Sequence, residues 1–192
     1  MAISAEEKQV IKSKAAKPML WLAIVSMCMI FGGLTSAYMV RRGDPGWLMF
    51  ELPKLFYFST AIIIISSFTM IWAVQSARKD NYFGVKAGIV LTLILGIAFI
   101  ICQIKAWDSL VAKGVFLTGS SSNPAGSFLY VISGAHLVHL LGGIIMLIFV
   151  CINSFRQLYH SKNLLGLQLS SIYWHFLDLL WIYLFLFLYF TH

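Results

Sequence analysis

Four ionisable side chains stand inside long apolar stretches of this sequence, where such groups are rare. His136 and His139 are three residues apart in one stretch, and His175 and Asp178 are three residues apart in another. If both stretches are helical, each pair lies on one face of its helix. Ionisable groups inside a membrane are costly, so each of them indicates a functional or structural role.

Two tryptophans accompany the only acid of these stretches. Trp174 precedes Asp178 by four residues and Trp181 follows it by three, so all three share one stripe of a helix. The indole N–H is a donor that needs a partner when it is buried. We therefore predict a polar cluster in which these indoles could donate to the carboxylate.

These residue types fit three kinds of site. A haem needs ligands from facing helices, so only His139 with His175 could clamp one, as in a small b-type cytochrome or quinone-handling protein. A proton-coupled transporter needs a connected relay, and one acid with three histidines leaves gaps. The third interpretation is a polar link between the two helices, or a contact with lipid headgroups. Physical reasoning favours the third and leaves the other two open.

The three cysteines give no further site. Cys28, Cys102 and Cys151 lie in apolar stretches, without CxxC spacing. A free cysteine there behaves as a small hydrophobic residue. We predict neither a disulfide nor a metal site from them.

Composition indicates which elements must position these residues. The chain has 192 residues, 60% hydrophobic and 11% charged, against about 45–50% apolar and about 25% charged in soluble domains. The apolar residues fall in blocks that are apolar all round, and a span needs roughly 20 of them. We predict an all-α polytopic bundle of five transmembrane helices at about 18–40, 54–77, 84–107, 126–155 and 166–190, after a tail at 1–17.

The distribution of basic residues predicts the orientation. Lys and Arg are more frequent in 1–17, 78–86 and 156–162 than in 41–54 and 105–113. The positive-inside rule therefore places the N-terminus in the cytoplasm. Topology and anionic headgroups account for the net charge of +7, so it does not indicate a nucleic-acid partner.

Several motifs occur together in an order that resembles subunit III of the haem–copper respiratory oxidases. The last predicted helix carries Trp-His-Phe-Leu-Asp-Leu-Leu-Trp, and the fourth carries Ser-Gly-Ala-His-Leu-Val-His after Asn-Pro-Ala-Gly-Ser-Phe-Leu-Tyr. Earlier positions that fit the same family are Leu52-Pro53, Ser59-Thr60, Ser66-Ser67, Thr92, Gly96, Phe99 and Gln103. The resemblance covers nearly the whole chain and is similar to the short, five-helix form of that family.

The resemblance implies a non-catalytic accessory subunit of a terminal oxidase in aerobic respiration. Such a subunit binds phospholipid in a cleft, here expected between the first two helices and the last three, and contacts the large catalytic subunit. Haem and copper then belong to partner subunits, and this chain holds no metal. The implied roles are support of proton uptake, stability and oxygen access, in the cytoplasmic membrane of a bacterium. Other oxidase subunits and a larger respiratory assembly are further expected partners, and the electron donor stays open between cytochrome c and quinol.

One position departs from that family. Its members usually carry a carboxylate on the helix that corresponds to the first predicted span. Aligned through Phe31, Gly33, Ala37 and Tyr38, this sequence has Met27 at that position. Any role that needs the acid is therefore expected to be absent or altered, and Asp178 is expected to lack its usual polar neighbour.

Overall fold

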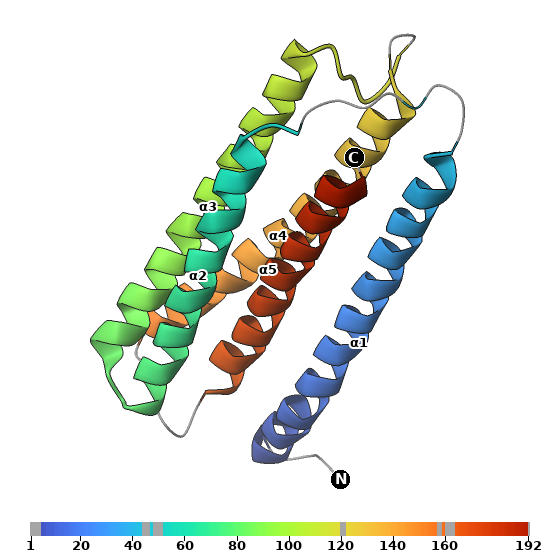
Figure 1. Ribbon diagram of the computed structural model, residues 1–192. Helices are drawn as coiled ribbons and strands as arrows, with labels where there is room; N and C mark the ends of the chain where they lie inside the picture. Colours follow the sequence, from blue (N-terminus) through green and yellow to red (C-terminus); the bar gives the residue numbers. More distant parts are fainter. Residues whose placement is uncertain are drawn as a thin grey trace.

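The computed structural model describes residues 5–43, 47, 52–119, 122–156, 159 and 164–191, with side chains from residue 15 onward. Regular structure in this part of the chain is entirely α-helical (Figure 1). The helices are α1 (Ala5–Arg41), α2 (Leu55–Arg78), α3 (Tyr82–Ala112), α4 (Pro124–Phe155) and α5 (Leu165–Thr191). Each is long and apolar enough to cross a membrane. The predicted all-α fold with five spans is confirmed.

Two helix ends lie beyond their predicted positions. Pro18 was expected in the first turn, but it lies inside α1, which begins at Ala5. The residues before it are mostly Ala, Glu and Lys, which favour helix, so the loss of one backbone bond at a proline does not end α1. α3 continues from Trp107 to Ala112. Residues 1–4 of the predicted tail lie outside the described residues.

A tight turn joins α2 to α3. The amides of Lys79 and Asn81 both donate to the carbonyl of Ser76, and Asp80 adopts a positive φ of 54°. Asn81 then caps α3, because its side chain accepts a hydrogen bond from the Gly84 amide at 3.1 Å. Such a short connection makes α2 and α3 antiparallel neighbours.

Small residues bring these two helices close together. A Cβ added at Gly88 would lie 2.8 Å from Cβ and 3.0 Å from Cα of Ala73 on α2. At Gly84 an added Cβ would meet the side chain of Ser76. Two small residues four positions apart, such as Gly84 and Gly88, are typical of helices that approach each other closely in a membrane.

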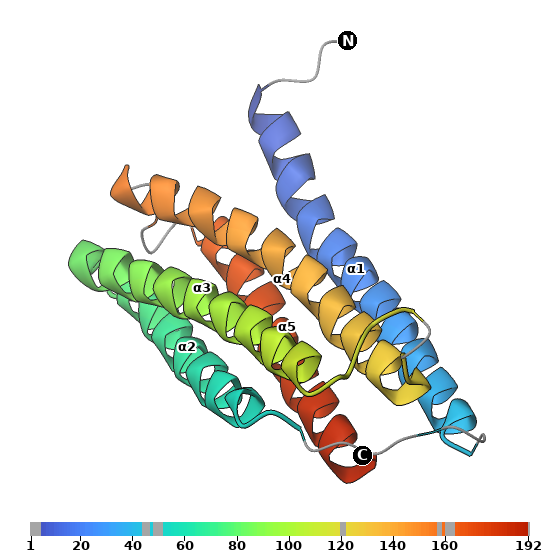
Figure 2. The ribbon, with the colours of Figure 1, turned by 90° about the horizontal axis from the view of Figure 1, so that it is seen from above.

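The predicted grouping of the first two helices against the last three is wrong. Between described residues, α1 contacts α4 and α5 but not α2, whereas α2 packs against α3 and α5. α1 stands at one edge of the bundle and the α2–α3 pair at the other, with α4 and α5 between them (Figures 1 and 2). A cleft with the predicted boundaries would separate α2 from α3, and the tight turn and glycine contacts hold these two helices together.

Candidate functional site

The last helix occupies the centre of the bundle, and its side chains form hydrogen bonds with α1, α2 and α4. α5 packs against α1, α2 and α4. Its Trp174 and Trp181 are among the largest fully buried side chains of the protein. Buried indoles in a membrane need hydrogen-bond acceptors, because no water is available to them there.

Both indoles find their acceptors on α2. Nε1 of Trp174 donates to Ser66 Oγ at 3.0 Å, and Nε1 of Trp181 donates to Thr60 Oγ1 at 3.1 Å. Each hydroxyl in turn donates to a carbonyl of its own helix, Ser66 to Ile63 and Thr60 to Phe56. A hydroxyl has one proton and two acceptor lone pairs, so this arrangement satisfies both groups. The prediction that the indoles donate to Asp178 is wrong.

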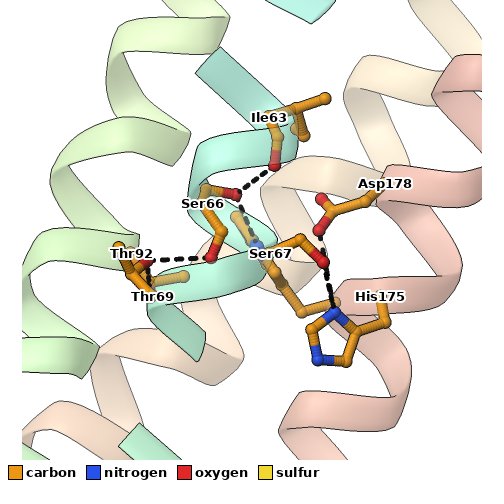
Figure 3. A network of polar contacts seen from close by, with 8 residues as sticks. Ile63, Ser66, Ser67, Thr69, Thr92, His175 and Asp178 are labelled. Carbon is orange, nitrogen blue, oxygen red and sulfur yellow. Dashed lines mark hydrogen bonds and ion pairs between the residues drawn. The ribbon is translucent and has the colours of Figure 1, made fainter. Parts of the chain in front are cut away.

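A second polar contact between the same helices involves the predicted histidine and acid. Ser67 Oγ and His175 Nδ1 are hydrogen-bonded at 2.7 Å, and Asp178 Oδ2 lies 3.9 Å from the same nitrogen (Figure 3). Asp178 is 3% exposed, and neither of its oxygens has a hydrogen-bond partner among the described residues. Ser67 therefore joins the pair to α2.

Hydroxyl contacts continue from α2 to α3. Thr69 Oγ1 lies 2.7 Å from Thr92 Oγ1, and Thr69 also donates to the Ser66 carbonyl at 2.8 Å. Thr92 donates to the Gly88 carbonyl at 2.8 Å. The two threonines have one hydroxyl proton each for these three contacts. When one threonine donates to the other across the interface, it therefore gives up the bond to its own helix. Figure 3 shows Ser66, Ser67 and Thr69 close together on α2, with Thr92 of α3 on one side of them and His175 of α5 on the other.

The two histidines of α4 have different surroundings. His136 is completely buried, with the rings of Phe31, Phe99 and Trp181 around it at centroid distances of 6.4, 6.1 and 5.2 Å. Neither of its ring nitrogens has a hydrogen-bond partner in the described part of the chain. His139 Nδ1 lies 2.7 Å from the Ala135 carbonyl, which can only accept, so this nitrogen carries the proton.

The predicted cluster of three histidines and one acid is therefore two separate groups. Phe31 of α1 contacts both His136 and His139, which agrees with their predicted common face. His175 and Asp178 instead face α2. The polar link of this pair consequently joins α5 to α2, and not α5 to α4 as predicted. The link joins α5 to α2 because the hydroxyl groups that lie beside Trp174, His175 and Trp181 belong to α2.

Sequence reasoning did not assign these hydroxyls to the site. We name five of the six Ser and Thr residues of α2, those in its first two-thirds, the hydroxyl stripe of α2: Ser59, Thr60, Ser66, Ser67 and Thr69. Ser59 accepts from Gln103 of α3 at 3.1 Å, so members of the stripe bond to both neighbouring helices. The recurrence of a Ser or Thr pair after seven residues, two helical turns, was the available signal.

Met27 lies on the buried side of α1. It is 5% exposed, one helical turn before Phe31 and therefore near the same face. Because α1 contacts α4 and α5 among the described residues, Met27 points toward these helices and not toward lipid. The position at which the resemblance leads us to expect a carboxylate is thus protein-facing.

No three His, Cys, Asp or Glu side chains come together as possible metal ligands in the described residues. His139 lies against α1 through Phe31, and His175 against α2 through Ser67. His139 and His175, the one pair that could have bound a haem from two sides, thus face different helices. The fold and these contacts define a multi-pass α-helical membrane protein whose central helix is held by indole–hydroxyl bonds.

Comparison with known proteins gives the family. A family model described as cytochrome c oxidase subunit III matches residues 45–192. A probable cytochrome c oxidase subunit 3 of Nocardia farcinica is 33% identical over 177 residues, which cover 90% of this chain and 85% of that protein. Two quinol oxidase subunits are also similar. The quinol oxidase subunit 3 of Bacillus spizizenii is 32% identical, over 86% of this chain and 81% of that protein. The cytochrome bo(3) ubiquinol oxidase subunit 3 of Pseudomonas aeruginosa is 29% identical, over 86% of this chain and 79% of that protein.

The chain belongs to the cytochrome c oxidase subunit III family. It is an accessory subunit of a terminal oxidase, as the ordered motifs predicted, and it associates with other oxidase subunits. The b-type cytochrome and the transporter, the alternatives left open by the residues alone, gain no support from these matches.

Proposed function

We propose that this chain is a non-catalytic subunit III that packs against the haem–copper catalytic subunit in the cytoplasmic membrane of a bacterium. In that place it stabilises the catalytic subunit during turnover, supports proton uptake and gives oxygen a path through bound lipid. Haem and copper reside in the partner subunits. The observation that carries the proposal is the family match together with the use of the polar side chains, most of which bond helix to helix.

The contacts of α5 support a scaffold role. Trp174 and Trp181 donate to hydroxyls that are already bonded to their own helix. His175 is bonded to Ser67, and His139 donates to its own backbone. An indole has a single N–H, so Trp174 and Trp181 keep no donor for a substrate, and each of the two histidines has one of its two ring nitrogens engaged within the fold.

His136, Asp178 and Met27 have a different place in the proposal. The nitrogens of His136 and the oxygens of Asp178 are buried without partners in the described residues, and Met27 replaces the carboxylate usual at its position. In this proposal, support of proton uptake does not run through a carboxylate at position 27. We propose that Asp178 affects lipid retention and the lifetime of the working oxidase.

Affinity purification from the native membrane tests the proposal. An affinity-tagged chain is expected to bring down a large subunit with a haem Soret band and oxygen consumption. Assays with reduced cytochrome c and with quinol then identify the donor, and native mass spectrometry reports the other subunits and any larger respiratory assembly. A preparation without any haem–copper subunit would overturn the proposal.

A deletion strain tests the accessory role separately. Oxidase without this chain is expected to begin turnover at a similar rate and to lose activity within fewer turnovers. Loss of all activity at the first turnover, in a complex that still holds its haems, would mean that this chain takes part in the chemistry.

A further inference from the structure

A groove of about 470 Å³ opens at the end of the bundle where the span of α1 begins, α2 ends and α5 begins. Volumes of this size are typical of ligand pockets. The groove exists because α1 and α2 make no contact between described residues while α5 packs against both. Its walls therefore come from α1 and α2, and its floor comes from the first turns of α5.

Each helix changes from polar to apolar in the same direction along this groove. On α1, Lys17 comes before Leu20; on α2, Arg78 comes after Val74. On α5, Gln168 comes before Ile172. Because α2 runs opposite to α1 and α5, the polar member of each pair is the one nearer the membrane surface. The groove thus has a polar mouth and an apolar interior.

The mouth of the groove is positively charged. Lys17 and Arg78 are both exposed and lie on opposite walls, and among the described side chains no acid lines the groove. Arginine and lysine are the side chains that hold phosphate groups, arginine through two parallel hydrogen bonds. This end also carries most of the chain's Lys and Arg residues, the side expected to face the anionic leaflet.

We propose that this groove binds one anionic phospholipid of the cytoplasmic leaflet. Lys17 and Arg78 contact its phosphate, the Gln168 amide donates to the glycerol ester region, and an acyl chain lies along Leu20 and Ile172. Free phosphate would satisfy only the mouth, so the apolar interior selects the lipid. This proposal rests on the proposed function in one respect, the binding of lipid by this chain. It adds the charge of the lipid, the leaflet from which it comes and the residues that bind it.

The test uses the intact oxidase that contains this chain, in nanodiscs of phosphatidylcholine with increasing phosphatidylglycerol, and counts retained lipids by native mass spectrometry. Lys17→Gln with Arg78→Gln is expected to weaken phosphatidylglycerol retention roughly tenfold or more, because each basic residue near the surface contributes to anionic lipid binding. Lys54→Gln with Lys113→Gln removes the same charge at the opposite, exposed end and is expected to leave retention unchanged.

A neutral variant tests the groove itself. Ile172→Trp keeps both charges, lies at an exposed position and fills the interior, so it is expected to displace the lipid while the subunits stay assembled. Equal retention in wild type and the Lys17/Arg78 variant would overturn the proposal, as would no preference for phosphatidylglycerol over phosphatidylcholine. An equal loss in the Lys54/Lys113 control would do the same, because it would show diffuse surface charge at work.

Two further readouts separate the possible failures. If inorganic phosphate alone displaces the retained lipid completely, the groove is a phosphate site and the lipid assignment is wrong. Co-purification with the haem–copper subunit is recorded in the same preparations. If the oxidase assembles and the groove variants have no effect, the groove assignment fails and the proposed function stands.

Discussion

Substitution of Gly88 by alanine tests how close the α2–α3 contact is. The added Cβ would lie 2.8 Å from Cβ, 3.0 Å from Cα and 3.1 Å from the backbone nitrogen of Ala73. Two of these three atoms are backbone, so the helices have to move apart and no side chain can turn away. Overpacking of this kind costs typically about 1–3 kcal/mol, while replacing a helical glycine by alanine returns about 1 kcal/mol.

A matched control removes the helix-propensity contribution. Gly33 is also inside a helix, and an added Cβ there meets nothing within 4 Å. Gly33→Ala is therefore expected to be neutral or stabilising by up to about 1 kcal/mol. The free energies of unfolding of the two variants should differ by about 1–3 kcal/mol, with Gly88→Ala the less stable.

The measurement is unfolding of the purified subunit in mixed micelles by SDS titration, followed by tryptophan fluorescence. The two variants carry the same substitution on the same type of element, so their difference reports the packing at α2 alone. If they unfold at the same SDS fraction with the same slope, the close approach of α2 and α3 at Gly88 is refuted.

Three further predictions concern polar groups. Thr92→Val removes the hydroxyl contact with Thr69. In the same SDS titration it should lower the free energy of unfolding by about 0.6 kcal/mol, and by at most about 1.7 kcal/mol. An unchanged free energy of unfolding would mean that the contact contributes nothing. Burial raises the pKa of Tyr159, opposed by the bond from Asn153. The unfolded chain then loses its proton first, so stability is constant below the ordinary pKa of about 10 and falls above it. Tyr159→Phe should unfold at higher pH in alkaline titration, and an unchanged midpoint would contradict this. Asp178→Asn should leave assembly nearly intact and change lipid retention or turnover lifetime, measured by subunit content and activity decay; a complex that never assembles would show Asp178 to be a packing residue.

Local features of the sequence predicted the spans and two details of their packing. Long charge-free blocks predict most helix ends to within a few residues, because hydrocarbon tolerates no unpaired backbone or charge; the start of α1 and the end of α3 lie farther out. Asn123 accepts from the Ala125 amide at 3.0 Å with Pro124 in the first turn, as expected of that dipeptide. The four-residue spacing of Gly84 and Gly88 is typical of a close helix contact, but it does not name the partner helix.

The choice of neighbours could not be predicted in the same way. A soluble helix shows which face is buried through its polar stripe, whereas lipid tails and protein interiors are equally apolar, and these spans are apolar all round. The sequence showed that Trp174 and His175 need partners but not where those partners lie. Their hydrogen-bond partners, Ser66 and Ser67, precede them by more than a hundred residues, and only the fold brings the two pairs together.

The distribution of polar contacts explains where the bundle leaves room for lipid. α2 is bonded to α5 through Trp174, Trp181 and His175, whereas the side-chain bond described between α1 and α5 is that of Tyr183 with Thr35, at 3.3 Å. α1 also lacks a contact with α2 in the described part of the chain. Both hollows beside α1 follow from this: the charged groove described above, and an apolar one of about 300 Å³ between α1 and α5. In our proposal, lipid in the charged groove takes the place of the contacts that α2 would otherwise make with α1.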